Sequence, residues 1–225
     1  MNDLARKTIG GFTQLTIGLG VLLFVPAWTF DFWQAWFYLI VFAGSSALIT
    51  AYLWQHDPKL LERRVAAGPG AEKETSQKAI QVLASLAFVS VLIVPSLDRR
   101  FSWSEVPFVI VVAGDIFVAL GFLVVFVVFR ENSFTAATIE VAAHQNVVST
   151  GPYSLVRHPM YLGALVMLFG TPLALASWWG LLTLVPMTLV ISWRLLDEER
   201  FLSKNLPGYA AYAQRVRHRL LPRIW

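Results

Sequence analysis

The polar residues best suited to chemistry gather in the last third of the chain. Residues 149–163 read Ser-Thr-Gly-Pro-Tyr-Ser-Leu-Val-Arg-His-Pro-Met-Tyr-Leu-Gly. The Thr-Gly-Pro-Tyr segment predicts a turn, because Gly supplies an unusual φ and Pro fixes the next residue. Pro159 suits the first position of a helix, where its missing N–H costs nothing. Arg157 and His158 are therefore predicted at a helix N-terminus, where N–H groups and the helix dipole favour an anionic group.

A second polar group follows one apolar stretch later, at Arg194, Glu198 and Glu199. Arg194 and Glu198 are four residues apart and hence share a helix face. A salt-bridged interfacial rim is the simpler interpretation, with that pair worth only a few tenths of a kcal/mol. If the stretch between the two groups is a helical hairpin, both groups lie on the same side of a membrane. Because they can then converge, we favour a functional site over a salt-bridged rim. Its candidate residues are Tyr153, Arg157, His158, Tyr161, Arg194, Glu198 and Glu199.

The composition indicates the elements that would position these residues. Of the 225 residues, 56% are hydrophobic and 14% are charged, against about 25% charged in soluble domains. This balance argues against a soluble enzyme and against disorder. The absence of Cys excludes a disulfide, a zinc–thiolate site and a cysteine nucleophile.

Long apolar runs predict the membrane spans, since crossing the hydrocarbon core takes roughly 20 apolar residues. The runs are residues 10–30, 32–55, 79–97, 107–129 and 160–196. The last run has 37 residues and contains Pro172 and Pro186, so we interpret it as a hairpin of two helices that turns near 177–180. The prediction is an all-α integral membrane protein of about six transmembrane helices, with the last two as a hairpin and a cytoplasmic C-terminal helical segment.

We divide the chain into two regions. Residues 1–130 form an N-terminal four-helix transmembrane region, and residues 131–225 form a C-terminal region with a cytoplasmic loop, the hairpin and the final segment. The stretch 56–78, with Gly-Pro-Gly at 68–70, is the only obvious loop rich in turn formers.

The basic residues predict the orientation, because cytoplasmic loops are enriched in Lys and Arg. With the N-terminus inside, sixteen of the eighteen Lys and Arg fall on the cytoplasmic side, and only Arg99 and Arg100 fall outside. Both termini are then cytoplasmic. The net charge of +4 indicates this bias and does not require nucleic acid as a partner. Trp28, Trp33, Trp36, Trp103, Trp178 and Trp179 fall at outer turns and Trp54, Trp193 and Trp225 at inner ends, as in interfacial aromatic belts.

Other features of the sequence favour no second chemistry. Asp115 lies in a span, but within about two turns of its outer end, so we expect it to snorkel or to bond a neighbouring helix. The four His are scattered and form no H-E-x-x-H, which makes a metal site unexpected. There is no G-x-G-x-x-G after a strand, no P-loop and no G-x-S-x-G. No span carries the paired charges of a proton-coupled transporter.

These motifs resemble those of a known family. The sequence resembles the integral-membrane methyltransferases related to isoprenylcysteine carboxyl methyltransferase. The resemblance lies in Val-Ser-Thr-Gly-Pro-Tyr at 148–153, R-H-P-M-Y-L-G at 157–163, Arg194 with the Glu-Glu pair, and Tyr209 with Tyr212 before a basic end. Phospholipid N-methyltransferases are distant relatives. The resemblance covers about the last 90 residues, and the short chain without Cys suggests a bacterial member in an inner membrane.

The resemblance implies S-adenosylmethionine as methyl donor and a cytoplasm-facing site. It implies cofactor-binding roles for Gln145, Asn146, Val147, Val148, Tyr153, His158, Pro159, Met160, Tyr161 and Glu198. It implies that Arg194 faces the substrate and that Arg157 is catalytic, and an amine acceptor would make Glu199 or His158 a candidate base. The ammonium and sulfonium of the cofactor suit Glu198 and the tyrosine rings, and its carboxylate suits the helix N-terminus.

The acceptor stays open at this point. A carboxylate acceptor follows the family name, but an amine or a thiol on a lipidic or small amphipathic molecule is equally compatible with the residues. Two other classes also remain: an NADPH-dependent membrane reductase of the sterol-reductase type, and a non-enzymatic scaffold or permease. The reductase would call for additional basic residues for the 2′-phosphate and for a longer chain.

Overall fold

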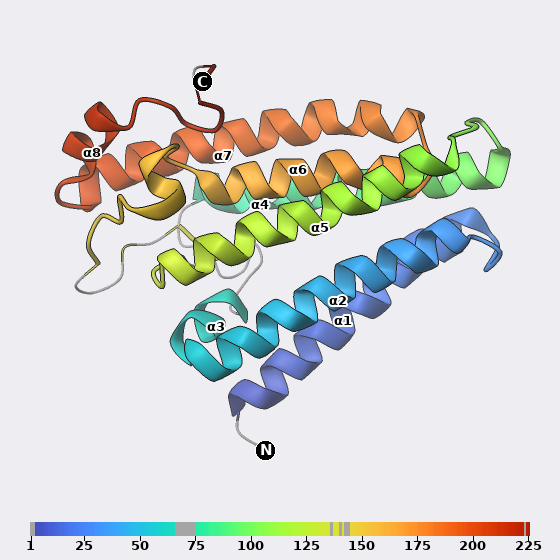
Figure 1. Ribbon diagram of the computed structural model, residues 1–225, viewed down its shortest axis with the longest axis horizontal. Coiled ribbons are helices and arrows are strands. Elements are labelled where there is room, and N and C mark those ends of the chain that lie inside the picture. Colours follow the sequence, from blue (N-terminus) through green and yellow to red (C-terminus); the bar gives the residue numbers. More distant parts are fainter. Residues whose placement is uncertain (1–2, 66–74, 136, 140, 142–144, 223) are drawn as a thin grey trace.

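The computed structural model describes residues 3–65, 75–135, 137–139, 141, 145–222 and 224–225 (Figure 1). This described part is helical and contains no strand. Its elements are α1 (Asp3–Ala27), α2 (Trp33–His56), α3 (Pro58–Val65), α4 (Thr75–Phe101), α5 (Phe108–Glu131), η1 (Gly151–Ser154), α6 (Pro159–Ala174), η2 (Trp179–Thr183), α7 (Leu184–Asn205) and α8 (Tyr209–Arg215).

The predicted all-α membrane architecture is confirmed. Among the described helices, α1, α2, α4, α5 and the η2–α7 segment are long and apolar enough to cross a membrane. The helix α6 is apolar but has 16 residues, or about 24 Å, so the predicted count of six full spans is not established. The last two helices do form a hairpin, and its turn lies at the predicted place, between Ala174 and Trp179.

The prediction of a loop at 56–78 is wrong for its first part, where α3 forms. Asp57 caps this helix, since its Oδ1 accepts the backbone N–H of Leu60 at 3.0 Å and Pro58 occupies the first helical position. Leu60 and Leu61 are buried, and the last turn carries Arg63 and Arg64. A short amphipathic helix therefore lies against the inner end of the bundle. The Gly-Pro-Gly at 68–70 lies outside the described residues.

The helices α5 and α6 form the tightest pair of the bundle. A Cβ added at Gly121 would lie 2.6 Å from the carbonyl oxygen of Gly163, and one added at Gly170 would lie 2.5 Å from that of Gly114. Each helix thus has two glycines seven residues apart that face the partner backbone. Small residues at such crossings let membrane helices approach closely, so this pair is the rigid centre of the fold.

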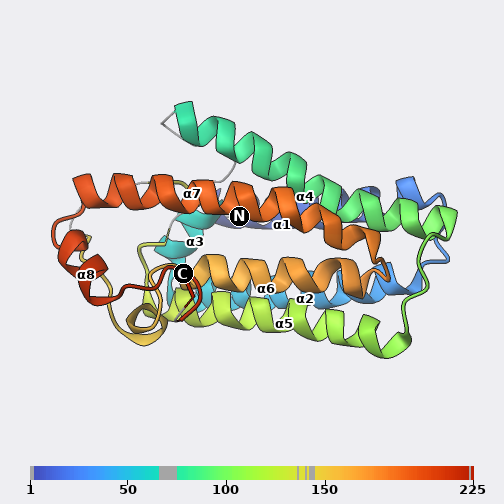
Figure 2. The same cartoon turned by 90° about the horizontal axis from the view of Figure 1, so that it is seen from above.

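Around this pair the other helices lie in layers (Figures 1 and 2). The helices α1 and α2 lie side by side on one face, and α2 contacts α5. Figure 2 shows α4 crossing the bundle obliquely, and it contacts both α1 and α7. The buried core between α1, α2 and α5 includes Leu23, Tyr38 and Val118. All nine Trp are exposed, as interfacial belts require.

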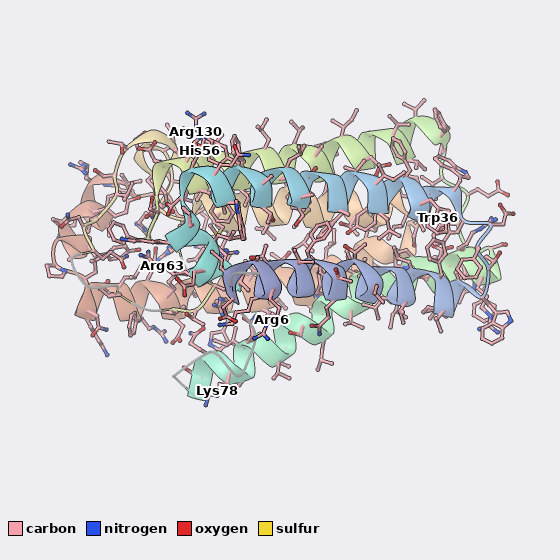
Figure 3. All side chains as sticks on the ribbon, turned by 90° about the horizontal axis from the view of Figure 1, so that it is seen from below. Arg6, Trp36, His56, Arg63, Lys78 and Arg130 are labelled. Carbon is pink, nitrogen blue, oxygen red and sulfur yellow. The ribbon has the colours of Figure 1, made fainter. Side chains whose placement is uncertain are left out.

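The two ends of the bundle differ in charge. Figure 3 shows the labelled Arg6, Arg63, Lys78 and Arg130 toward one end, and Trp36 at the other. The predicted orientation is based on this distribution of basic residues. The cytoplasmic location of the basic end stays a prediction.

The turns at the other end are joined by a buried carboxylate, Asp98. Its Oδ1 accepts the backbone N–H of Ser104 at 2.7 Å, and its Oδ2 accepts the hydroxyls of Ser104, at 2.6 Å, and of Ser177. We call Asp98, Ser104 and Ser177 the outer carboxylate cluster. It links the end of α4, the α4–α5 connection and the hairpin turn.

The expectation for Asp115 is wrong. Its side chain neither snorkels nor bonds a neighbouring helix: it is 3% exposed, and neither carboxylate oxygen has a hydrogen-bond partner among the described residues. The close α5–α6 contact at the adjacent Gly114 leaves this side chain inside the bundle.

Candidate functional site

The basic end of the bundle contains a cavity of about 640 Å³. Its polar compartment is lined by the loop after α5, the N-terminus of α6 and the inner part of α7. It continues as an apolar limb between α1, α2, α5 and α6. We define the apolar limb by Leu15, Phe42, Ser46, Ile49, Thr50, Leu53, Phe122, Val125, Ala164 and Met167.

The structure brings nearly all of the predicted site residues to this cavity. The lining includes Gln145, Asn146, Val147, Val148, Tyr153, Arg157, His158, Pro159, Met160, Tyr161, Arg194 and Glu198. Glu199 alone among the predicted residues does not line it.

Glu199 is instead held by three cationic or ionisable side chains. Its Oε1 lies 2.6 Å from Nε of Arg157 and 3.2 Å from Nε2 of His158, and its Oε2 lies 2.9 Å from Nε of Arg219. We call these four residues the Glu199 network. Both oxygens of this carboxylate are engaged by side chains of the protein, and Glu199 does not line the cavity, so the geometry does not support Glu199 as a general base.

Arg157 ties the C-terminal segment to the site. Its Nη1 donates to the backbone carbonyls of Ala213, Val216 and Arg217 at 3.0–3.2 Å. The backbone N–H groups of Arg157 and His158 donate to the carbonyls of His218 and Arg219. The returning chain therefore engages these two N–H groups, and the predicted position for an anionic group at this helix N-terminus stays a prediction that depends on the N–H groups of α6 itself.

Glu198 and Arg194 face the cavity with separate partners, not as the expected helix pair. The hydroxyl of Tyr161 donates to Oε2 of Glu198 at 2.7 Å. Arg194 reaches α4, where its Nη1 donates to Oε1 of Gln81 at 2.9 Å. Its Nη2 donates to the carbonyl of Ala137, in the loop after α5, at 3.0 Å. Glu198 is thus oriented by one neutral donor and keeps further acceptor capacity toward the cavity.

Tyrosines form one wall of the polar compartment. The helix η1 begins at Gly151, whose φ of 55° suits glycine, and it carries Tyr153. The side-chain amide of Asn132 donates to the Tyr153 hydroxyl at 3.1 Å, and the Tyr212 hydroxyl donates to the Tyr153 carbonyl at 2.8 Å. Burial raises the pKa of Tyr153, and it raises the pKa of Tyr212 to about 12. Both phenols are therefore neutral at physiological pH.

Sequence reasoning missed several polar residues of the lining, among them Arg64 on α3, Gln81 on α4 and Asn132 after α5. The Asp-Pro start and the Leu-Leu pair of α3 were a local signal for that helix. Nothing local indicates that its last turn reaches a cavity formed by residues about a hundred positions later. Within the described residues, no group of three or more His, Asp or Glu is arranged to hold a metal ion.

Comparison with known proteins finds similarity to methyltransferases. Residues 109–207, which include α6, α7 and all of α5 except its first residue, match the phospholipid methyltransferase family. The chain is also 29% identical over 201 residues to a probable protein-S-isoprenylcysteine O-methyltransferase of Oryza sativa subsp. indica, and equally to that of subsp. japonica. Each alignment covers 85% of this chain and 97% of the relative.

A helical membrane bundle with these matches supports a membrane methyltransferase. Within that class, residues 109–207 are similar to the phospholipid methyltransferases, and most of the chain is similar to probable isoprenylcysteine methyltransferases, as its motifs predicted.

Proposed function

We propose that this protein transfers the methyl group of S-adenosylmethionine to the carboxylate of a lipidic or small amphipathic acceptor, as the names of its relatives suggest for isoprenylcysteine. The observation that carries the proposal is a single cavity with a polar compartment at one end and an apolar limb between membrane helices at the other. A donor and an acceptor of opposite polarity can meet in such a space.

The polar compartment suits the methyl donor. Glu198 offers a carboxylate for the ammonium group, and the rings of Tyr153 and Tyr161 suit a cationic sulfonium. The first turn of α6 begins at Pro159, and the N–H groups of a helix N-terminus suit a carboxylate. The volume of about 640 Å³ falls within the usual range for ligand pockets, about 300–1,000 Å³.

The apolar limb suits a hydrocarbon chain. It extends along α6 from Met160 to Met167, which is about 10 Å of helix. Its walls are aliphatic and aromatic apart from the hydroxyls of Ser46 and Thr50. An acceptor lying in the limb would present its polar end to the donor at the level of Met160.

The chemistry asks little of the protein beyond position. When bound, S-adenosylmethionine supplies an electrophilic methyl group. A carboxylate oxygen is already nucleophilic, so no base is needed, which agrees with the engagement of Glu199 in ion pairs. The residues of this chain would align the two groups and exclude water from between them. Arg157 as a catalytic residue stays a prediction; its contacts in the structure are with Glu199 and the C-terminal segment.

The test is ligand-dependent stabilisation of the detergent-solubilised protein, followed by methyl transfer. S-adenosylhomocysteine at 100 times its Kd should add about 2.7 kcal/mol of stability, and NADPH should add none. Radiolabelled S-adenosylmethionine with N-acetyl-S-farnesylcysteine should then yield a methyl ester that base hydrolyses to methanol. Stabilisation by NADPH alone would favour the reductase, and stabilisation by neither would favour a scaffold or a permease.

A further inference from the structure

Arg64 places a positive charge where the apolar limb opens into the polar compartment. Its Nη1 lies 3.8 Å from Sδ of Met160, and its guanidinium carbon lies 5.1 Å from the ring centroid of Phe129. Met160 and Phe129 both line the cavity, and with Leu53 and Leu61 they belong to one apolar cluster at this level. The guanidinium is therefore at the boundary between the two compartments.

Three described arginines line the cavity, at different places on its wall. Arg157 is held by Glu199 and three backbone carbonyls. Arg194 is held at the far wall by Gln77, Gln81 and Ala137. Arg64 is the one whose guanidinium stacks on the aromatic and thioether surface of the limb mouth.

The chemistry of Arg64 suits a carboxylate at this boundary. Burial lowers the pKa of Arg64, and repulsion from Arg194 lowers it further, although the group stays charged at physiological pH. A guanidinium presents a planar fork of donors that matches a carboxylate.

We propose that Arg64 is a specificity-determining residue that binds the carboxylate of the acceptor at the mouth of the apolar limb. The inference rests on the proposed function and names the contact that would select an acid over an amide, an amine or an ester. One carboxylate oxygen forms the new bond to the methyl carbon while the carbon–sulfur bond breaks and its electron pair stays on sulfur. The product ester is neutral, so it loses its attraction to Arg64 and leaves more readily than the acid.

The test compares Arg64→Gln with Arg63→Gln. Arg63 is the adjacent residue of α3, is half-buried and bonds the carbonyl of Ser133, so it controls for charge and helix without lining the cavity. The probes are N-acetyl-S-farnesylcysteine and its carboxamide. We expect Arg64→Gln to raise KM for the acid about tenfold or more, with kcat changed less than about threefold, and Arg63→Gln to change neither.

A binding measurement keeps the inference separate from the proposed function. Wild-type protein should be stabilised more by the acid than by the carboxamide, and Arg64→Gln should lose that difference even if no methyl transfer occurs. A protein that fails to bind S-adenosylhomocysteine would instead overturn the proposed function. The inference is overturned if wild type binds acid and carboxamide equally, or if Arg64→Gln keeps the preference. Should Arg64→Gln fail to fold, Arg64→Lys decides, since it keeps the charge without the fork; an unchanged KM for the acid would contradict the role.

Discussion

Each end of the helical bundle contains a buried carboxylate that joins separate chain segments, and the two differ in their donors. At the outer end, Asp98 accepts only neutral donors, from Ser104 and Ser177. At the basic end, Glu199 accepts from Arg157 and Arg219 and lies beside His158. The outer carboxylate cluster closes two turns, whereas the Glu199 network holds the C-terminal segment beside a cavity.

This difference shows how to distinguish acidic residues that stabilise the fold from acidic residues that can bind a ligand. Both oxygens of Asp98 and of Glu199 accept donors of the chain itself, and neither residue lines the cavity. Glu198 lies on the same helix as Glu199 but is rotated about 100° from it, and among the described residues its hydrogen-bond donor is the Tyr161 hydroxyl. Adjacent glutamates thus have separate roles, one supporting and one facing the cavity.

The largest effect is expected for Glu199→Gln. Removing the carboxylate leaves the guanidinium of Arg157 buried without its counter-charge, which should lower the free energy of unfolding by about 3–5 kcal/mol. Denaturant unfolding in detergent, followed by Trp fluorescence, measures this loss. A loss below about 1 kcal/mol would mean that the network does not hold the C-terminal segment.

Glu198→Gln should show the opposite pattern. The free energy of unfolding should change by less than about 1 kcal/mol, whereas affinity for S-adenosylhomocysteine should fall about 10- to 150-fold, because a charge-assisted hydrogen bond of about 1.5–3 kcal/mol is lost. Isothermal calorimetry decides this. Unchanged affinity would remove Glu198 from the cofactor site, and a loss of stability like that of Glu199→Gln would erase the proposed difference between the two acids.

Asp98→Asn should destabilise without affecting ligands. The amide cannot accept all of the donors that the carboxylate accepts, so the free energy of unfolding should fall by about 1.5–3 kcal/mol. The control is Glu105→Gln, at an exposed position of the same connection. Added stability from saturating S-adenosylhomocysteine should equal that of wild type; a smaller increment would show that the two ends are coupled.

The smallest effect is expected for Asp115→Asn. This buried carboxylate has no hydrogen-bond partner, so its replacement by a neutral amide should leave stability unchanged or raise it by up to about 1 kcal/mol. The same unfolding assay applies, with Asp98→Asn as the contrasting acid. A loss of more than about 1 kcal/mol would indicate that Asp115 has a stabilising partner in the membrane-embedded protein.

Much of the fold could be predicted because membrane spans leave a local signal. Apolar runs located the long helices, and a break near residue 177 located the hairpin turn. The helix α3 was missed because its eight residues are too few for a hydropathy pattern to stand out from a polar stretch. The division of the chain at residue 130 stays a prediction, and the cavity draws on both sides of it.

The site was predictable where motif residues are contiguous and not where it depends on distant contacts. The segment 157–161 lies at the cavity because a proline-initiated helix places it there. The engagement of Glu199 was not predictable, because it depends on Arg219 and on carbonyls of residues 213–217 folding back over Arg157. Helix periodicity alone indicates that the adjacent Glu198 and Glu199 point in different directions. It does not indicate which of the two side chains faces the cavity.

The shortness of α6 has a consequence for how the protein fits a bilayer. A lipid-facing helix of 16 residues would be about 6 Å shorter than a hydrocarbon core of about 30 Å, a hydrophobic mismatch that membranes accommodate by thinning. Within α6 only Phe169 is exposed, so its neighbours, and not lipid, set its length. Because α6 does not have to match the membrane thickness, it can begin at Pro159. The cavity can then extend below the membrane surface, while the surrounding helices still span the full hydrophobic thickness.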